Sequence, residues 1–93
     1  MNITDIKVRK LFPEGELKAI LSITFDSQLV LHDVKLIKNG EKIIIAMPNR
    51  RTPSGFIDIV HPVNAEFRAV IDGAVKKAYE EALEAQNTEL RNA

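Results

Sequence analysis

The sequence contains no cysteine, no tryptophan and few aromatic residues, and these absences narrow the classes of protein that it can encode. Without cysteine the chain forms no disulfide scaffold, no thiolate zinc site and no cysteine nucleophile. Its longest apolar run, at residues 43–47, is far shorter than the ~20 residues that cross a bilayer. No charged and then apolar leader opens the chain, so we expect a soluble cytoplasmic protein that does not enter a membrane.

An excess of charge of one sign is also lacking. Thirteen Lys and Arg residues balance thirteen Asp and Glu residues, which excludes a uniformly basic protein of the histone type. The 93 residues are 45% apolar, which is enough for the core of one small domain, and the chain is too short for two domains. A chain of this size buries only ~60–65% of its unfolded surface, so self-association is expected.

The spacing of the apolar residues changes near residue 62, from a period of two to a period of 3.6. Before that point we expect five antiparallel strands, at residues 3–11, 17–25, 29–37, 43–47 and 56–60. The second strand has the clearest register, because its apolar residues all fall on one face: Leu17, Ala19, Leu21, Ile23 and Phe25. Asn39-Gly40 predicts a tight hairpin after the third strand.

The fourth and fifth strands are predicted from different signals. Residues 43–47 are continuously apolar, which is typical of a central strand buried on both faces. Residues 49–55 are polar and predict a loop, and residues 56–60 predict a short strand that His61-Pro62 ends. The first and the fifth strands are the candidates for the edges of the sheet.

A long helix is predicted after Asn64, a good N-cap residue, with Glu66 placing negative charge in the first turn. Its apolar stripe can pack on a face of the sheet: Phe67, Val70, Ile71, Ala74, Val75, Ala78, Ala82 and Leu83. The fold class is therefore α+β, an about five-stranded antiparallel sheet followed by one long C-terminal helix. We expect a single domain over residues 1–84 and a frayed polar tail over residues 85–93.

Residues that would support catalysis are scarce. His32 and Asp33 are adjacent in a predicted strand and therefore point to opposite faces. His61 lies three residues after Asp58, but no serine elbow accompanies them, so a ring that hydrogen-bonds to backbone or carboxylate is the preferred interpretation. The carboxylates show no metal-ligand spacing, and the glycines form no phosphate-binding pattern. We expect no enzymatic activity, no metal, no cofactor and no small-molecule substrate.

Arg50 and Arg51 are the main candidates for binding nucleic acid. They are adjacent, Asn49 and Thr52 flank them, and no acidic residue occurs at positions 43–57. Guanidinium groups make planar bidentate contacts with phosphate, and Asn and Thr add further donors. The sequence leaves an alternative open, a solvated turn whose arginines pair with carboxylates elsewhere in the fold.

The predicted helix adds Arg68, Lys76 and Lys77 as further candidates. At ~100° per residue, Arg68 and Lys76 can share a broad basic face, while Lys77 lies almost opposite Arg68. The alternative is that these side chains only solvate the helix. The aromatic residues mostly fall at core positions, with Tyr79 the best candidate for exposure, so binding by base stacking is not evident.

Assembly is a third possibility, because an open sheet leaves unpaired backbone groups at its edges. Pairing of two edges across a twofold axis would enlarge the core and double each Arg50-Arg51 segment. The alternative function that follows from this possibility is a non-enzymatic protein-interaction adaptor that dimerises by its sheet edges and does not bind nucleic acid directly.

Four segments resemble a known family: residues 3–6 (ITDI), 31–34 (LHDV), 46–53 (AMPNRRTP) and 58–64 (DIVHPVN). Together they resemble the SpoVG family, the stage V sporulation protein G or septation proteins, from residue 1 to about residue 84. The resemblance implies a bacterial cytoplasmic regulator that forms a homodimer, binds DNA and in some members RNA, and has no enzymatic activity. It further implies a role in septation and in sporulation-type gene control.

The same resemblance implies where nucleic acid binds. The segment with Arg50 and Arg51, and the helix that begins after Asn64, are the expected contacts. The residues expected to take part are Asn49, Arg50, Arg51, Thr52, Arg68, Lys76 and Lys77.

Overall fold

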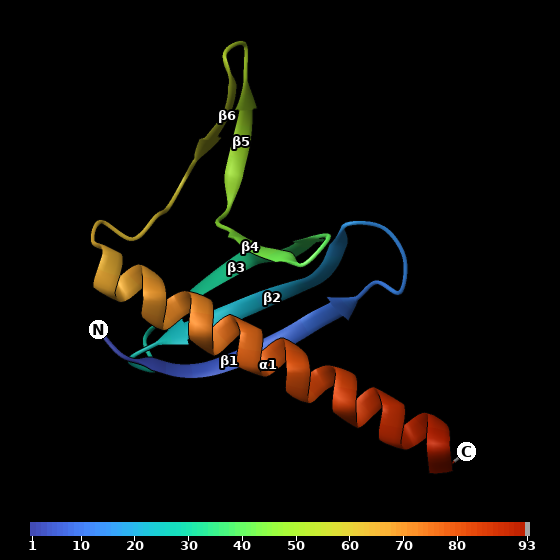
Figure 1. The fold of residues 1–93 in the computed structure, drawn as a ribbon. Coiled ribbons are helices and arrows are strands. Elements are labelled where there is room, and N and C mark those ends of the chain that lie inside the picture. Colours follow the sequence, from blue (N-terminus) through green and yellow to red (C-terminus); the bar gives the residue numbers. More distant parts are fainter. Residues whose placement is uncertain (93) are drawn as a thin grey trace.

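Six strands and one helix make up the part of the chain that the structure describes, which is the backbone of residues 1–92 and the side chains of residues 1–86. In this computed structural model they are β1 (Ile3–Leu11), β2 (Leu17–Phe25), β3 (Leu29–Asn39), β4 (Lys42–Ala46), β5 (Asn49–Thr52), β6 (Gly55–Asp58) and α1 (Ala65–Asn92) (Figure 1). Strands β1 to β4 form one antiparallel sheet in that order, and β5 pairs with β6 in a separate two-stranded ribbon. The predicted α+β class is confirmed.

Tight turns connect the strands of the sheet and set their register. Asp26 and Ser27, between β2 and β3, have φ angles of 50° and 55°. The hairpin predicted between β3 and β4 is confirmed, although its two corner residues are Gly40 and Glu41 because Asn39 still pairs within the strands. Gly40 has a φ of 64°, a conformation that glycine adopts without steric cost at the first corner of such a turn.

The core lies between one face of the sheet and α1, which crosses that face (Figure 1). The predicted inward face of β2 is confirmed, because its central residues are buried: Ala19, Leu21, Ile23 and Phe25. From α1, Ile71 and Val75 complete this core, and the rings of Phe67 and Phe25 lie 5.9 Å apart between their centroids. The apolar stripe of the helix therefore packs on the sheet as predicted, except that Val70, which was assigned to the stripe, is 53% exposed.

The beginning of α1 also follows the prediction, since Asn64 Oδ1 accepts a hydrogen bond from Phe67 N at 2.7 Å. The backbone of α1 continues to Asn92, through most of the segment 85–93 for which the sequence predicts a frayed tail. Ala93 and the side chains of residues 87–92 lie outside the described residues. Within the described part of the chain, no helix is apolar over a sufficient length to span a membrane.

Strand β4 lies at an edge of the sheet, so the prediction of a central strand is wrong. It pairs with β3 alone, and Ile44 is 41% exposed while its neighbour Ile45 is buried. A short apolar run does not distinguish a central strand from an edge strand that exposes single apolar residues, which soluble proteins commonly do. The other edge of the sheet is β1, as predicted.

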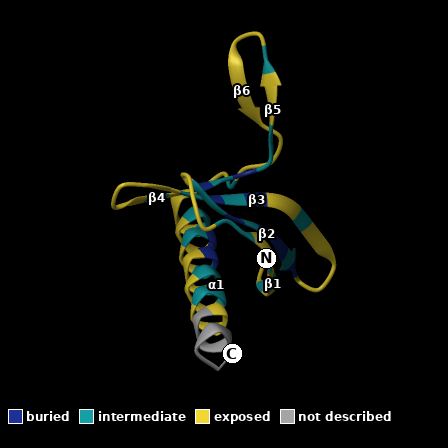
Figure 2. Ribbon diagram, turned by 90° about the vertical axis from the view of Figure 1, so that its right-hand side faces the viewer, coloured by how far each residue is buried: buried dark blue, intermediate teal, exposed yellow. Residues whose placement is uncertain are grey.

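The prediction of a loop over residues 49–55 is also wrong, because β5 and β6 form a hairpin over residues 49–58, which we call the arm. The predicted fifth strand pairs within this arm and does not join the main sheet. The arm projects beyond β4 and is exposed along most of its length (Figure 1, Figure 2). Since neither face of the arm is buried, no alternation of apolar residues marks β5 as a strand.

Candidate nucleic-acid interface

Arg50 and Arg51 lie on opposite faces of the arm. Arg50 is directly across from Ile57 and Arg51 directly across from Phe56, and neighbouring residues of a strand point to opposite sides. Both arginines are exposed. Among the described residues the one ion pair joins Arg68 to Asp72, so neither arginine of the arm is paired with a carboxylate. The structure therefore shows unneutralised guanidinium groups on both faces of the arm.

Asn49 and Thr52, the two neighbours of these arginines, hold the arm together. Asn49 Nδ2 donates a hydrogen bond to Met47 O at the base (3.1 Å), and Thr52 Oγ1 donates to Gly55 O across the turn (2.8 Å). Gly55 has a φ of 123°, a conformation that L side chains rarely adopt. The polar side chains of β5 therefore shape the arm that presents the arginines.

Phe56 is the most exposed aromatic side chain among the described residues, at 73%, so the prediction that it occupies the core is wrong. Tyr79, the expected exposed aromatic residue, is partly buried and packs against the core. The reason is that the arm has no core of its own, whereas Tyr79 lies on the side of α1 that faces the sheet. An aromatic ring and Arg51 thus share one face of the arm.

The face of the sheet that points away from α1, which we call the outer face, carries cations that the sequence reasoning did not select. Lys10 of β1 and Lys35 of β3 lie directly across from Ile20 on its two sides, and Lys7 lies across from Ser22. Ile20 and Ser22 alternate with the buried residues of β2, so these lysines all point outward. The cations of the outer face are Lys7, Arg9, Lys10, Lys18, Lys35 and Lys42, and Asp5 is on the same face.

A hydrogen-bonded chain fixes one of these cations. Arg9 Nε donates to Ser22 Oγ at 3.1 Å, and Ser22 Oγ lies 3.1 Å from His32 Nδ1, so three neighbouring strands are linked. The Ser22 hydroxyl is buried beneath these two side chains although it belongs to the outward row of β2. Because its Nε is engaged, the Arg9 guanidinium is held over the sheet with its terminal nitrogens available to an anion.

The outer face continues into the base of the arm. A cavity of about 350 Å³ is lined by Lys35 of β3, by Asn49 at the start of the arm and by Ile59, which directly follows the arm. Asp33 also lines this cavity, so its rim carries one carboxylate. A surface that carries these cations, together with the carboxylates of Asp33 and Asp58, therefore runs from the arm past Lys35 to the row that contains Arg9.

The cations predicted on the helix lie apart from this surface. Lys76 and Lys77 are exposed on α1, which covers the other face of the sheet, and the arm and the C-terminal half of α1 extend to opposite ends of the molecule (Figure 1). Arg68 is bound within the fold, since its Nη2 donates to Ile45 O at 2.9 Å and its Nε lies 3.5 Å from Asp72 Oδ1. The structure thus separates the predicted helix residues from Arg50 and Arg51.

The substitution Arg68→Ala is expected to lower the free energy of unfolding by about 1–2 kcal/mol, because it removes a charge-assisted hydrogen bond from the helix to the edge strand β4. It also leaves Asp72 Oδ1, which is buried and has no hydrogen-bond partner, without its nearby cation. Urea unfolding of the two proteins measures the difference. Lys76→Ala, at an exposed position of the same helix, is the matched control, and an equal stability of all three proteins would contradict the structural role of Arg68.

The outer-face cations had a signal in the sequence, since Lys7, Lys18 and Lys35 alternate with apolar residues at the period of a strand. The missing information was which strands are neighbours, because only the register places cations from β1, β2 and β3 on one surface.

The ring of His61 makes the predicted contact with backbone, whereas the ring of His32 contacts a hydroxyl group, which is neither backbone nor carboxylate. His61 Nδ1 lies 3.1 Å from Pro62 O, and His32 Nδ1 lies at the Ser22 hydroxyl. Within the described residues no group of three or more His, Asp and Glu side chains is arranged to hold a metal ion. The exposed Arg50 and Arg51 guanidinium groups can bind anions.

Comparison with known protein families shows that residues 1–81 match the SpoVG family. The chain is 54% identical over 84 residues to a protein of Clostridioides difficile (strain 630), covering 89% of this chain and 91% of that one. It is 49% identical over 85 residues to a protein of Thermoanaerobacter sp. (strain X514), covering 90% and 92% of the two chains. Both relatives carry the name "Putative septation protein SpoVG".

The chain belongs to the SpoVG family. The resemblance seen in the four sequence segments is thereby confirmed.

Proposed function

We propose that this protein is a cytoplasmic regulator that binds nucleic acid as a homodimer and acts in septation and sporulation-type gene control. The ligand is the phosphate backbone of duplex DNA and, through the same chemistry, of RNA. The observation that carries the proposal is the pair of exposed arginines, Arg50 and Arg51, on a projecting arm where no carboxylate neutralises them.

The shape of the arm supports duplex DNA as the ligand. The major groove of B-DNA admits a two-stranded ribbon, and several DNA-binding proteins insert such a ribbon into a groove. With Arg50 and Arg51 on opposite faces, a ribbon lying in a groove directs one guanidinium toward each of the two flanking backbones. The arginines position the protein, and they carry no sequence information by themselves.

The outer face extends the contact in this proposal. Lys35 lies next to the base of the arm, and Arg9 and Lys10 continue the cationic surface across β1. Lys76 and Lys77 are the outermost part of the proposed site, since they reach the same nucleic acid only where it bends around the molecule or where a second subunit brings them near. Arg68 takes part only indirectly, because its hydrogen bond to Ile45 O fixes the position of α1 on the sheet.

Fluorescence anisotropy with labelled duplex DNA and labelled single-stranded RNA tests this proposal at salt concentrations from ~50 to ~200 mM. We expect binding that weakens linearly with salt on a double logarithmic scale, and retention of the protein on heparin up to high salt. An adaptor that binds only proteins would show neither. No binding to either nucleic acid at ~50 mM salt would therefore refute the proposal and favour the adaptor.

A further inference from the structure

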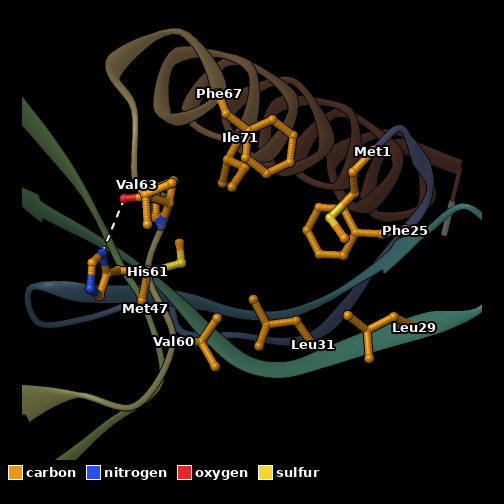
Figure 3. A pocket seen from close by; sticks show the side chains of 11 residues that line it. Met1, Phe25, Leu29, Leu31, Met47, Val60, His61, Val63, Phe67 and Ile71 are labelled. Atoms are coloured by element: carbon orange, nitrogen blue, oxygen red, sulfur yellow. Dashed lines mark hydrogen bonds between the residues drawn. The ribbon is translucent and has the colours of Figure 1, made fainter.

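Two cavities adjoin the base of the arm, on opposite sides of the sheet. The one of about 270 Å³ opens on the side of α1, where Phe25 of the sheet faces Phe67 of the helix (Figure 3). Sites for small polar ligands combine an apolar lining with a few converging polar groups. The one ionisable side chain in this lining is His61, whose Nδ1 already lies 3.1 Å from Pro62 O (Figure 3). This cavity therefore lacks the polar groups that would orient such a ligand.

The other cavity, of about 350 Å³, lies on the outer face and does have polar groups; we call it the outer cavity. Its volume is at the lower end of the ~300–1,000 Å³ that ligand pockets have, which suits a molecule of one small ring system. Polar and apolar residues line it in equal number: Asp33, Lys35, Asn49, Met47, Pro48 and Ile59.

An irregularity of β3 brings Asp33 to the outer cavity. His32 and Asp33 together stand opposite Ser22 of β2, which is a β-bulge. Asp33 has a φ of 61°, in the left-handed region that Asn and Asp enter more readily than other side chains do. Bulges commonly redirect side chains beside functional sites. Here the ring of His32 lies at the Ser22 hydroxyl, and Asp33 is left at the wall of the outer cavity.

Asp33 and Lys35 have opposite charges but do not pair with each other. Within the part of the chain that the structure describes, the one ion pair joins Arg68 to Asp72. An ionised carboxylate accepts hydrogen bonds through both oxygens, whereas an ammonium group only donates them. The outer cavity therefore offers two acceptor oxygens and a cationic donor that no partner neutralises.

The apolar wall of the outer cavity continues onto the arm. Ile59 lines the cavity and is 63% exposed, and Ile57 is 50% exposed. Ile59 N donates to Pro48 O at 2.8 Å, which extends the strand pairing of the arm by one residue, so Ile57 and Ile59 lie on the same face. Arg50 is directly across from Ile57 and shares this face. An exposed apolar surface beside a guanidinium group suits a flat base whose own chain carries phosphates.

We propose that the outer cavity binds an unpaired guanine base of a nucleic-acid strand. The Watson–Crick edge of guanine has two adjacent N–H donors, at N1 and N2, next to the O6 acceptor. In the proposed complex the carboxylate of Asp33 accepts from both donors, Lys35 Nζ donates to O6, and the base lies against Ile59. Adenine, cytosine and uracil have no two adjacent donor atoms on this edge, so a carboxylate discriminates against all three.

This proposal deepens the proposed nucleic-acid binding and rests on it. Base pairing covers the Watson–Crick edge in a duplex, so the outer cavity recognises single-stranded segments, where proteins commonly contact this edge. Arg50, on the same face as Ile57, contacts a phosphate of the same strand. The arm then contributes to two modes of binding, because its arginines contact the backbone of any strand while the cavity at its base recognises one unpaired base.

Fluorescence anisotropy with labelled single strands tests the proposal. The strands are about eight nucleotides long, within the usual site sizes, and consist of uridine with one central guanosine or inosine. Inosine keeps N1–H and O6 but lacks the N2 amino group. We expect the wild type to bind the guanosine strand roughly 10-fold more tightly, because one hydrogen bond to a charged group is lost with inosine. DNA strands of the same design should give the same ratio, since the proposed contacts are with the base.

The variant Asp33→Asn should abolish this preference and bring the ratio of the two affinities to about 1, because the amide offers one acceptor in place of two. Asparagine tolerates the left-handed conformation, so circular dichroism should show an unchanged fold. Asp58→Asn is the matched control, since it removes the same charge from an exposed residue of the arm that does not line the outer cavity. The control should keep the roughly 10-fold ratio of the wild type.

Three results would overturn the guanine site. They are equal affinities of the wild type for the two strands, a preference that Asp33→Asn retains, and a preference that persists when the guanosine is paired in a duplex. Salt-dependent binding without any preference refutes the guanine site alone and leaves the proposed function standing. A protein that binds neither the single strands nor duplex DNA refutes both proposals.

Discussion

Replacing Arg50 and Arg51 together by alanine is expected to lower the affinity for duplex DNA roughly 100- to 1,000-fold at low salt, because the proposed homodimer would lose about four phosphate contacts, each worth about 1 kcal/mol or more. The double logarithmic slope of affinity against salt should become less steep by about 3–4, since each phosphate contact contributes ~0.9 to that slope. The measurement is the anisotropy titration at several salt concentrations. The fold should not change, because both side chains are exposed and make no ion pair within the described residues.

The double variant Lys76→Ala/Lys77→Ala is the matched control for this experiment, because it removes the same charge from two adjacent exposed residues. If the arm is the primary contact, the control loses much less affinity and less of the salt slope than the arginine variant. Equal losses in the two variants would mean that net charge, and not the position of the arginines, determines binding. An unchanged affinity of the arginine variant would eliminate the arm as the site.

The substitution Leu21→Ala is expected to lower the free energy of unfolding by about 3–4 kcal/mol, a large share of the 5–15 kcal/mol that small domains have. Leu21 is fully buried in the strand that has neighbours on both sides, so the vacated volume is lined by rigid sheet and cannot collapse easily. Urea unfolding followed by circular dichroism measures the loss. Ile44→Ala, at a 41% exposed position of the edge strand, should cost less than about 1 kcal/mol.

A cost of Leu21→Ala as small as that of Ile44→Ala would contradict the position of the core. It would mean that α1 does not seal the inward face of β2 in solution. The comparison of the two variants separates this possibility from a general sensitivity of the sheet, because both positions are apolar and both lie in paired strands.

The elements that have a buried face could be predicted from the sequence. The alternation of Leu21 and Ile23 with polar neighbours identifies β2, and Asn64 before an apolar stripe identifies the start of α1. The arm could not be identified in this way, because a ribbon exposed on both faces has no apolar alternation. The edge position of β4 was equally out of reach, since strand order depends on which strands pair and not on the composition of any one strand.

Part of the candidate site, its two arginines, could be predicted from the sequence, whereas their orientation and the role of Arg68 could not. Two adjacent arginines without a nearby acid stand out in the sequence, and the structure places them on a projecting arm. That they face opposite sides follows only from their being in a strand, which the loop prediction excluded. The role of Arg68 was hidden for another reason, because its partner Ile45 O lies 23 residues away in the chain and carries no sequence signature.

The placement of α1 on one face of the sheet and of the lysines on the other has an electrical consequence. Residues 1–64 contain nine basic and seven acidic residues, and α1 contains four basic and six acidic residues. The neutral chain is therefore divided into a strand part with a net charge of +2 and a helix with a net charge of −2. Such a molecule has a permanent dipole moment and turns in the field of a polyanion before it makes contact. Such an orientation would bring its strands, and with them Arg50 and Arg51, to the polyanion first.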